Sequence, residues 1–144
     1  YIQLATETFF TYTSGNNATS VVVGGATVQV GGGADLIAYV GHDGLMDFAA
    51  PTVKAPANKE VRRTIILACI SQHYFREPLR TTGASPLVWT TGLMAPEAYT
   101  LEAAISAWVG GADDAAVREK AAAAYHAYQK CGLNAARKLL VTGW

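Results

Sequence analysis

The chain has 144 residues, and its 11 basic and 11 acidic side chains cancel. Because no basic excess exists to attract a polyanion, binding of nucleic acid or of an anionic membrane is disfavoured. Hydrophobic residues make up 51% of the chain and charged residues only 15%, a composition that excludes disorder and fits a single domain over residues 1–144. No apolar run is long enough to span a membrane and no leader sequence is visible, so we expect a cytoplasmic protein.

The first residue of the chain and its low charge suggest that another segment or another copy covers part of its surface. The first residue is Tyr1 rather than Met, and few charged side chains are present to cover a surface. We therefore expect the C-terminal part of a larger domain, completed by a missing N-terminal segment or by a second copy in a homo-oligomer. The two cysteines lie far apart in the sequence, so a disulfide scaffold is not expected.

The first third of the chain predicts a helix followed by a hairpin. Apolar residues over 2–12 recur loosely at helical spacing, and Ser14-Gly15-Asn16-Asn17 ends that segment. Two β-rich runs, residues 20–23 and 26–30, then flank Gly24-Gly25. Such runs on either side of two glycines are typical of a tight hairpin.

Three short apolar runs follow, at Asp35–Val40, Thr64–Ile70 and Pro86–Thr91. None alternates between apolar and polar residues, which favours strands buried on both faces of a parallel sheet. Between the second and third runs, Gln72–Arg80 predicts a short helix that ends near Pro78.

The C-terminal third predicts helices. Pro96 suits the first turn of one helix, and Asp113 suits the N-cap of the next. In that second helix one stripe places Cys131 in the core, together with Val117, Ala121, Tyr125 and Tyr128. A last helix is expected over residues 134–141. Strands alternating with helices predict an α/β fold, with a mostly parallel sheet and helices on both of its faces.

Two residues with nucleophilic and acid–base chemistry stand at the ends of the first two apolar runs. His42 follows one strand and Cys69 ends the other. Sites in open parallel sheets form beyond the carboxyl ends of the strands. If the two strands are neighbours, only about 5 Å of sheet spacing separates these ends. The sequence therefore predicts a thiol and an imidazole that work together.

The surroundings of this pair fit thiol chemistry. A thiol with a free pKa of about 8.5 is mostly protonated at neutral pH, and a nearby imidazole can accept its proton. A helix that starts after Ser71 adds positive dipole potential beside Cys69. Glycines at 41 and 44 allow positive φ, and backbone N–H groups of the turn at Asp43 and Gly44 can hold an oxyanion.

Other interpretations of these residues remain open. His42 is also a typical turn residue beside glycine, and Cys69 a small core side chain. A metal site built from Cys69, His73 and His42, with Asp43 or Asp47, is a further alternative, although the spacing matches no strong metal pattern. The glycine runs at 24–25 and 31–33 precede no helix, which excludes a dinucleotide or phosphate loop, and no cofactor is expected.

The two strand ends resemble those of the caspase-like superfamily of cysteine peptidases, which includes caspases, legumains, gingipains, clostripains and separases. The resemblance rests on DLIAYVGHDG at 35–44 and TIILACIS at 64–71, with the His before the Cys. Bacterial members of the group share features with residues 39–48 and 93–99. The resemblance implies a caspase-like three-layer sandwich, with Cys69 as nucleophile and His42 as its acid/base partner.

The sequence departs from the family in three places. Asp43 stands where the family has Gly directly after the His, which leaves the oxyanion role of Asp43 and Gly44 open. The His-to-Cys gap is 27 residues, against roughly 50 in caspases, so the intervening helix is expected to be reduced or absent. The family's opening strand–helix–strand unit has no counterpart in the 34 residues before Asp35. The sheet is therefore expected to be incomplete on its N-terminal side, with an exposed edge.

In the family, the pocket for the residue before the cleaved bond lies beside the strand that follows the Cys. The corresponding positions here are Trp89, Thr90, Thr91 and Gly92. A basic substrate residue would be matched by Asp43, Asp47 or Glu97, and an acidic one by Arg76 or Arg80.

The leading hypothesis is a cysteine-dependent hydrolase of peptide bonds, acting on a peptide or protein through a Cys69–His42 dyad. One alternative is an inactive caspase-like module that works by protein association. Another is a metal-dependent hydrolase.

Overall fold

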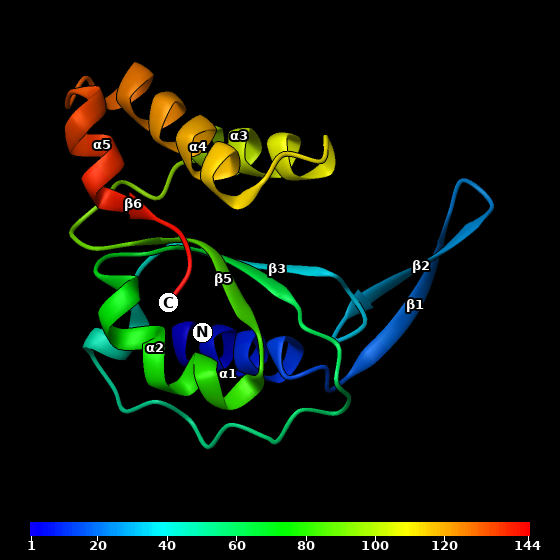
Figure 1. Cartoon of the computed structure of the whole chain (residues 1–144). Helices are drawn as coiled ribbons and strands as arrows, with labels where there is room; N and C mark the ends of the chain where they lie inside the picture. The colour runs from blue at the N-terminus through cyan, green and yellow to red at the C-terminus, as the bar shows by residue number, and fades with distance from the viewer.

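Four strands form the central sheet of the computed structural model, which describes all 144 residues (Figure 1). Their order across the sheet is β3-β4-β5-β6, and the first three run parallel while β6 pairs antiparallel with β5. The strands are β3 (Leu36–Val40), β4 (Arg63–Leu67), β5 (Ser85–Thr90) and β6 (Leu140–Val141). The predicted α/β class and the mostly parallel sheet are confirmed.

Helices cover both faces of the sheet, as predicted. On one face lie α1 (Ile2–Thr13) and α2 (Ser71–Thr82), whose Phe9 and Phe75 pack against Tyr39 and Trp89 of the sheet. On the opposite face lie three helices, α3 (Ala98–Val109), α4 (Asp114–Gln129) and α5 (Leu133–Leu139). Figure 1 shows these two helical layers on either side of the strands.

Strand β3 is less buried than predicted. β4 and β5 are buried on both faces, but β3 alternates, with Ile37 and Tyr39 buried and Ala38 and Val40 exposed. The reason is its place at the edge of the sheet, where only the face toward α1 is covered. The predicted exposed edge is present at β3.

Three helix boundaries differ from the prediction. The last helix, expected over residues 134–141, ends at Leu139, and Leu140–Val141 form strand β6 instead, paired with β5. The second helix does not end near Pro78: α2 runs through this proline to Thr82, because buried Leu79 and Thr82 hold its last turn in the core. Gly83 then ends it with a φ of 76°. Pro96 lies outside α3, which begins at Ala98.

The prediction that Cys131 packs in the core is wrong. Asp113 caps α4 as predicted, through a 2.8 Å hydrogen bond from the Ala116 N–H. However, α4 ends at Gln129, and Lys130 turns the chain with a positive φ. Cys131 therefore falls beyond the buried face of the helix and is exposed.

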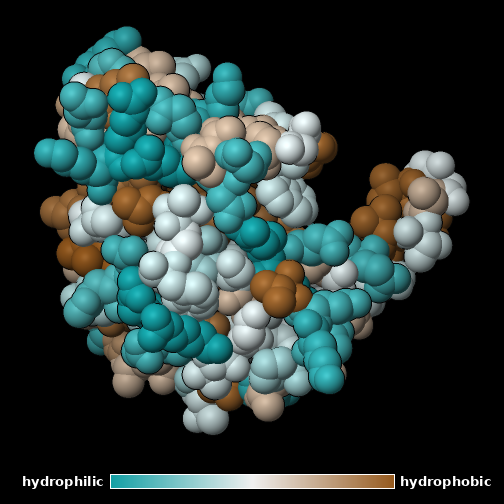
Figure 2. Space-filling model, viewed as in Figure 1, coloured by the Kyte–Doolittle hydropathy of each residue, from teal (hydrophilic) through white to brown (hydrophobic).

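The predicted hairpin is present as β1 (Ala18–Val23) and β2 (Ala26–Gly31), which pair antiparallel around Gly24-Gly25. It projects from the rest of the molecule in Figure 1, and Figure 2 shows hydrophobic surface on it. Only Val30 and Gly31 at its base are partly covered.

The connection between β3 and β4 contains no α-helix, only the short 3-10 helix η1 (Gly44–Met46) and an irregular loop. The reduced crossover expected from the short His-to-Cys spacing is thus confirmed. None of the helices has the combination of length and hydrophobicity that crossing a membrane requires.

Candidate functional site

His42 and Cys69 follow directly neighbouring parallel strands. Val40 of β3 pairs with Leu67 of β4, and the Gly41 N–H donates to the Leu67 carbonyl at 3.0 Å. His42 and Cys69 each stand two residues beyond this last pair. The C-terminal ends of β3 and β4 therefore lie side by side, at the same end of the sheet.

Cys69 lies in the turn between β4 and α2 and is partly exposed, whereas Ala68 before it is fully buried. Its Sγ accepts from the Met94 N–H at 3.5 Å and contacts the Met94 carbonyl oxygen at 3.6 Å. Helix α2 begins at Ser71, one residue before the predicted start. The thiol thus sits at the positive end of a helix dipole and within reach of solvent.

Ile70, between Cys69 and the helix, has a left-handed backbone with φ 53° and ψ 30°. This conformation is a genuine outlier for a β-branched residue, and such strain is concentrated at functional turns. The Ile70 N–H donates to the Gly92 carbonyl at 2.9 Å, which ties the turn to the chain after β5. Sequence reasoning missed this feature because isoleucine carries no signal for positive φ.

The loop after β3 holds His42 through both its backbone and its side chain. Gly41 takes a φ of 145°, as its predicted freedom allows. The Tyr39 hydroxyl donates to the His42 carbonyl at 2.8 Å, and Nε2 of His42 lies 2.6 Å from Oδ2 of Asp47. Asp47 was expected only as a pocket carboxylate or a metal ligand. A spacing of five residues in a loop does not predict a contact between its side chain and His42.

Asp43 points into the protein and is fully buried. Its Oδ1 accepts from the Leu45 N–H at 2.9 Å, which caps η1, while Oδ2 is buried without a partner. Burial raises the pKa of this carboxyl to about 6, against the lowering effect of the Leu45 hydrogen bond and of nearby His42. The buried Asp43 side chain therefore stabilises the loop that carries His42.

Gly44 is required for a reason other than the one predicted. It does not take a positive φ. Instead it is buried, and a Cβ there would lie 2.6 Å from the Phe48 ring and 2.7 Å from Ile2. The absence of a side chain lets η1 pack closely against α1.

The residues predicted to line a substrate pocket do not all face solvent. Trp89 and Thr90 are fully buried, because β5 is a central strand covered on both faces. Thr91 is exposed and donates to the Lys138 carbonyl at 2.7 Å, and Gly92 lies beside the Cys69 turn. None of the grooves in the structure is lined by these four residues.

The arginines proposed for an acidic substrate are engaged elsewhere. The Arg76 guanidinium lies 5.7 Å from the centre of the Trp89 ring, and the Arg80 guanidinium 5.1 Å from that of Trp144. Both guanidinium groups extend from α2 onto aromatic rings, that of Trp89 in β5 and that of Trp144 at the C-terminus.

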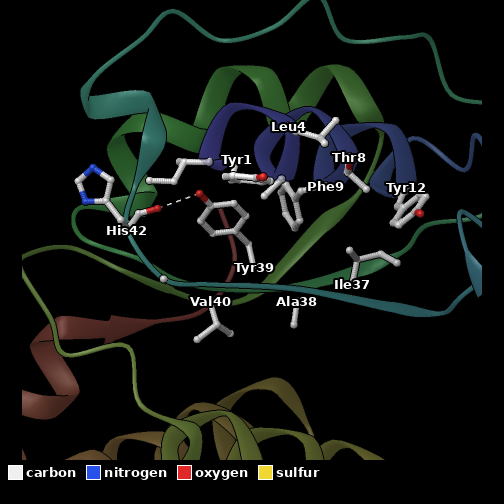
Figure 3. Close-up of a pocket in the computed structure, with 13 residues that line it drawn as sticks. Tyr1, Leu4, Thr8, Phe9, Tyr12, Ile37, Ala38, Tyr39, Val40 and His42 are labelled. Atoms are coloured by element: carbon white, nitrogen blue, oxygen red, sulfur yellow. Dashed lines mark hydrogen bonds between the residues drawn. The ribbon is translucent and has the colours of Figure 1, made fainter.

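A mostly apolar groove of about 810 Å³ runs between α1 and the edge strand β3 and reaches His42. Figure 3 shows Leu4, Thr8 and Tyr12 from α1 on one side, with Ile37 and Tyr39 facing them from β3. Sequence reasoning predicted the exposed edge but not the groove, which depends on how α1 lies across the sheet.

No three His, Cys, Asp or Glu side chains lie together in an arrangement that holds a metal ion. Cys69, His73 and His42 therefore do not form a ligand set in this structure.

Neither a scan of protein-family models nor searches of curated proteins and of solved structures finds a match to this chain. The chemistry of the site is therefore inferred from its own residues.

Proposed function

We propose that this protein is a cysteine-dependent hydrolase of peptide bonds, with Cys69 as the nucleophile and His42 as its acid/base partner. One observation carries the proposal: the Val40–Leu67 pair of two parallel strands precedes His42 and Cys69 by two residues each. Strands in a sheet lie about 4.8 Å apart, so these turns start close enough for an imidazole and a thiol to meet.

The fold supports a relation to the caspase-like superfamily. The His strand comes before the Cys strand, the two are parallel neighbours, and helices cover both faces of the sheet. These features fit the central part of a caspase-like three-layer sandwich. The bare edge at β3 fits a sheet that is incomplete on that side.

The proposed reaction begins with transfer of the Cys69 thiol proton to the His42 imidazole. The thiolate attacks the peptide carbonyl carbon, and the carbonyl oxygen takes up negative charge. When the C–N bond breaks, the imidazolium gives its proton to the leaving amine, and a thioester remains on Cys69. A water molecule, deprotonated by His42, then hydrolyses the thioester and releases the acid. The N-terminus of α2, two residues beyond Cys69, favours the thiolate.

Cys131 provides an internal reference for testing this reactivity. It is exposed, whereas Cys69 is only partly exposed, so accessibility alone predicts faster labelling of Cys131. We expect the reverse at pH 6.5: iodoacetamide should label Cys69 about tenfold faster or more, because the thiolate is the reactive form. Labelling is followed at each cysteine by mass spectrometry of the full chain.

Three variants complete the test. Cys69→Ala should abolish the fast labelling, Cys131→Ala should leave it intact, and His42→Asn should slow it. Equal rates at the two cysteines of the wild type, or an unchanged Cys69 rate in His42→Asn, would contradict the proposal. A screen of mixed peptides, with Cys69→Ala as the blank, then tests for hydrolysis.

The exposed hairpin favours a second candidate function, association with another protein or another copy. The β1–β2 register places Val21, Val23 and Val28 on one face of the hairpin. The other face carries Ser20, Thr27 and Gln29 together with Val22. The three valines are 41%, 61% and 43% exposed. An isolated two-stranded hairpin is marginal in water, so an apolar face on one indicates a contact surface.

Sedimentation velocity over a range of concentrations tests self-association. We expect a dimer or larger species that Val21→Lys converts to a monomer and that Ser20→Lys, on the opposite face of the hairpin, leaves unchanged. A wild type that stays monomeric at every concentration would exclude self-association through the hairpin.

A further inference from the structure

His42 and Asp47 form a contact that the Cys69–His42 dyad does not require. Nε2 of His42 and Oδ2 of Asp47 are 2.6 Å apart, and both side chains are about half or more exposed. Isolated exposed ion pairs contribute little to stability. The contact therefore needs an explanation in terms of what it does to the imidazole.

The backbone holds both partners in place. The His42 carbonyl accepts from the Tyr39 hydroxyl at 2.8 Å, and the Asp47 N–H donates to the Gly44 carbonyl at 3.0 Å. Between them, the Asp43 carboxylate caps η1 through the Leu45 N–H. The pair is therefore built into a hydrogen-bonded turn, unlike a chance meeting of two long flexible side chains.

The contact determines which ring nitrogen is free. An ionised carboxylate can only accept, so Nε2 carries the proton that it donates to Asp47. In the neutral imidazole the lone pair then lies on Nδ1. When the ring takes a second proton, the same carboxylate faces a positive imidazolium and stabilises it.

We propose that Asp47 is the positioning residue for His42: it accepts the Nε2–H hydrogen bond, holds the ring, and leaves Nδ1 to exchange the proton with the Cys69 thiol. The proposal rests on the function proposed above and adds to it. The proton leaves Sγ for Nδ1 as the thiolate forms, and it passes from Nδ1 to the leaving amine as the C–N bond breaks. Asp47 keeps its charge throughout and gains no proton.

Other ionisable groups near the imidazole enter the pH dependence. From its own loop these are Asp43, buried next to it, and Asp47 itself. Tyr1, the residue before α1, lines the same groove as His42, and Cys69 follows the neighbouring strand β4. Variants at Asp47 alone leave these other groups in place.

The experiment measures the rate of Cys69 alkylation by iodoacetamide from pH 5 to pH 9, resolved from Cys131 by mass spectrometry. We expect Asp47→Asn to slow Cys69 labelling about tenfold at pH 6.5. The midpoint of the rise of the labelling rate with pH should move to a higher pH. Asp47→Glu, which keeps the carboxylate, should restore part of the rate. Asp35→Asn, on an exposed carboxylate at the opposite end of β3, is the matched control and should change nothing.

Two further readouts separate positioning from a structural role. The urea midpoint of unfolding should be nearly the same in Asp47→Asn and wild type. Nitrogen-15 NMR of the ring, assigned with His42→Asn, should show the Nε2–H tautomer in wild type and a mixture in Asp47→Asn. A lower urea midpoint with unchanged alkylation midpoint and tautomer would assign Asp47 a structural role and overturn the inference.

The failure of this inference differs from that of the proposed function. If His42→Asn slows Cys69 labelling and Asp47→Asn does not, the dyad stands and only the role of Asp47 is wrong. If neither variant changes the labelling rate, both the dyad and the positioning role are wrong.

Discussion

Ser71 and Thr90 are joined by two hydrogen bonds that hold the Cys69 turn against β5. The Ser71 N–H donates to the Thr90 hydroxyl at 3.2 Å, the Thr90 N–H donates to the Ser71 hydroxyl at 3.0 Å, and the two hydroxyls lie 3.1 Å apart. The Thr90 hydroxyl also donates to the Ala68 carbonyl, on the other side of Cys69. Both residues are fully buried, so the turn has a rigid support beneath it.

Replacing this support should cost stability and reactivity together. Thr90→Val keeps the shape and the β-branch but leaves the Ser71 N–H and the Ala68 carbonyl without a partner. Unsatisfied buried groups cost about 1–3 kcal/mol, so we expect a loss of about 2 kcal/mol in the free energy of unfolding. Cys69 labelling should also slow. Urea denaturation and site-resolved alkylation measure the two effects.

Thr100→Val is the matched control. Thr100 is likewise fully buried, but its hydroxyl has no hydrogen-bond partner. Its removal should leave stability unchanged or raise it. Equal losses in the two variants would show that the Ser71–Thr90 bonds have no special role.

The left-handed backbone of Ile70 predicts an unusual order of stabilities. A non-glycine residue there costs roughly 1–2 kcal/mol, and glycine avoids that cost. Ile70→Gly should therefore be more stable than Ile70→Ala by about 1 kcal/mol, although both lose the same packing. At Ile105, a partly buried position inside α3, the order should reverse because glycine disfavours helix. Urea midpoints of the four variants test this, and alanine above glycine at both sites would be the contrary result.

Asp43 predicts a pH-dependent loss of stability. Its carboxyl has a pKa of about 6 in the folded protein against 3.8 for the free group, so the native state binds the proton more tightly. The free energy of unfolding should therefore fall as pH rises from about 4 to about 6, by about 3 kcal/mol, since one pKa unit corresponds to about 1.4 kcal/mol. Asp43→Asn, which keeps the acceptor for the Leu45 N–H, should remove this decline.

The measurement is urea denaturation of both proteins at half-unit steps from pH 4 to pH 7.5. The stability of Asp43→Asn relative to wild type should rise across the window and level off above it. Asp35→Asn, on an exposed carboxylate, serves as the control and should run parallel to wild type. A constant difference between Asp43→Asn and wild type would refute the prediction.

The contacts of Arg62 at the base of the hairpin predict that lysine at this position gives a much less stable protein than arginine. Its side chain is 5% exposed, and its Nε donates to the Gly32 carbonyl at 2.6 Å while Nη1 reaches the Asn58 side chain at 3.2 Å. The guanidinium lies so close to Gly15 that a Cβ there would be 2.7 Å from Nη1. An ammonium group cannot reproduce this planar arrangement.

We therefore expect Arg62→Lys to lower the free energy of unfolding by about 2 kcal/mol, since a buried acceptor loses its donor. The β1–β2 hairpin should also become more sensitive to proteolysis. Arg80→Lys changes a half-exposed guanidinium and should have a much smaller effect. Calorimetry measures the stability, and limited proteolysis with a protease other than trypsin measures the sensitivity of the hairpin. Similar effects of the two variants would contradict the prediction.

Much of the local structure follows from local chemistry. The glycine pair at 24–25 predicts the hairpin, and Asp113 predicts the start of α4, since turn and cap geometry depend on a few adjacent residues. The apolar runs likewise place His42 and Cys69 just beyond two buried strands. These predictions are confirmed because neighbours in the sequence are enough to produce them.

The sequence by itself therefore determined most of the helices and strands, though not β6, and that a thiol and an imidazole follow two of those strands. Only the tertiary structure decided that β3 is covered on one face alone, that Ile70 is left-handed, that Cys131 is exposed and that Asp47 contacts His42. Each of these features depends on which surfaces pack against a segment or on how a whole loop folds. No propensity of the single residue expresses such a contact, so only the folded chain determines it.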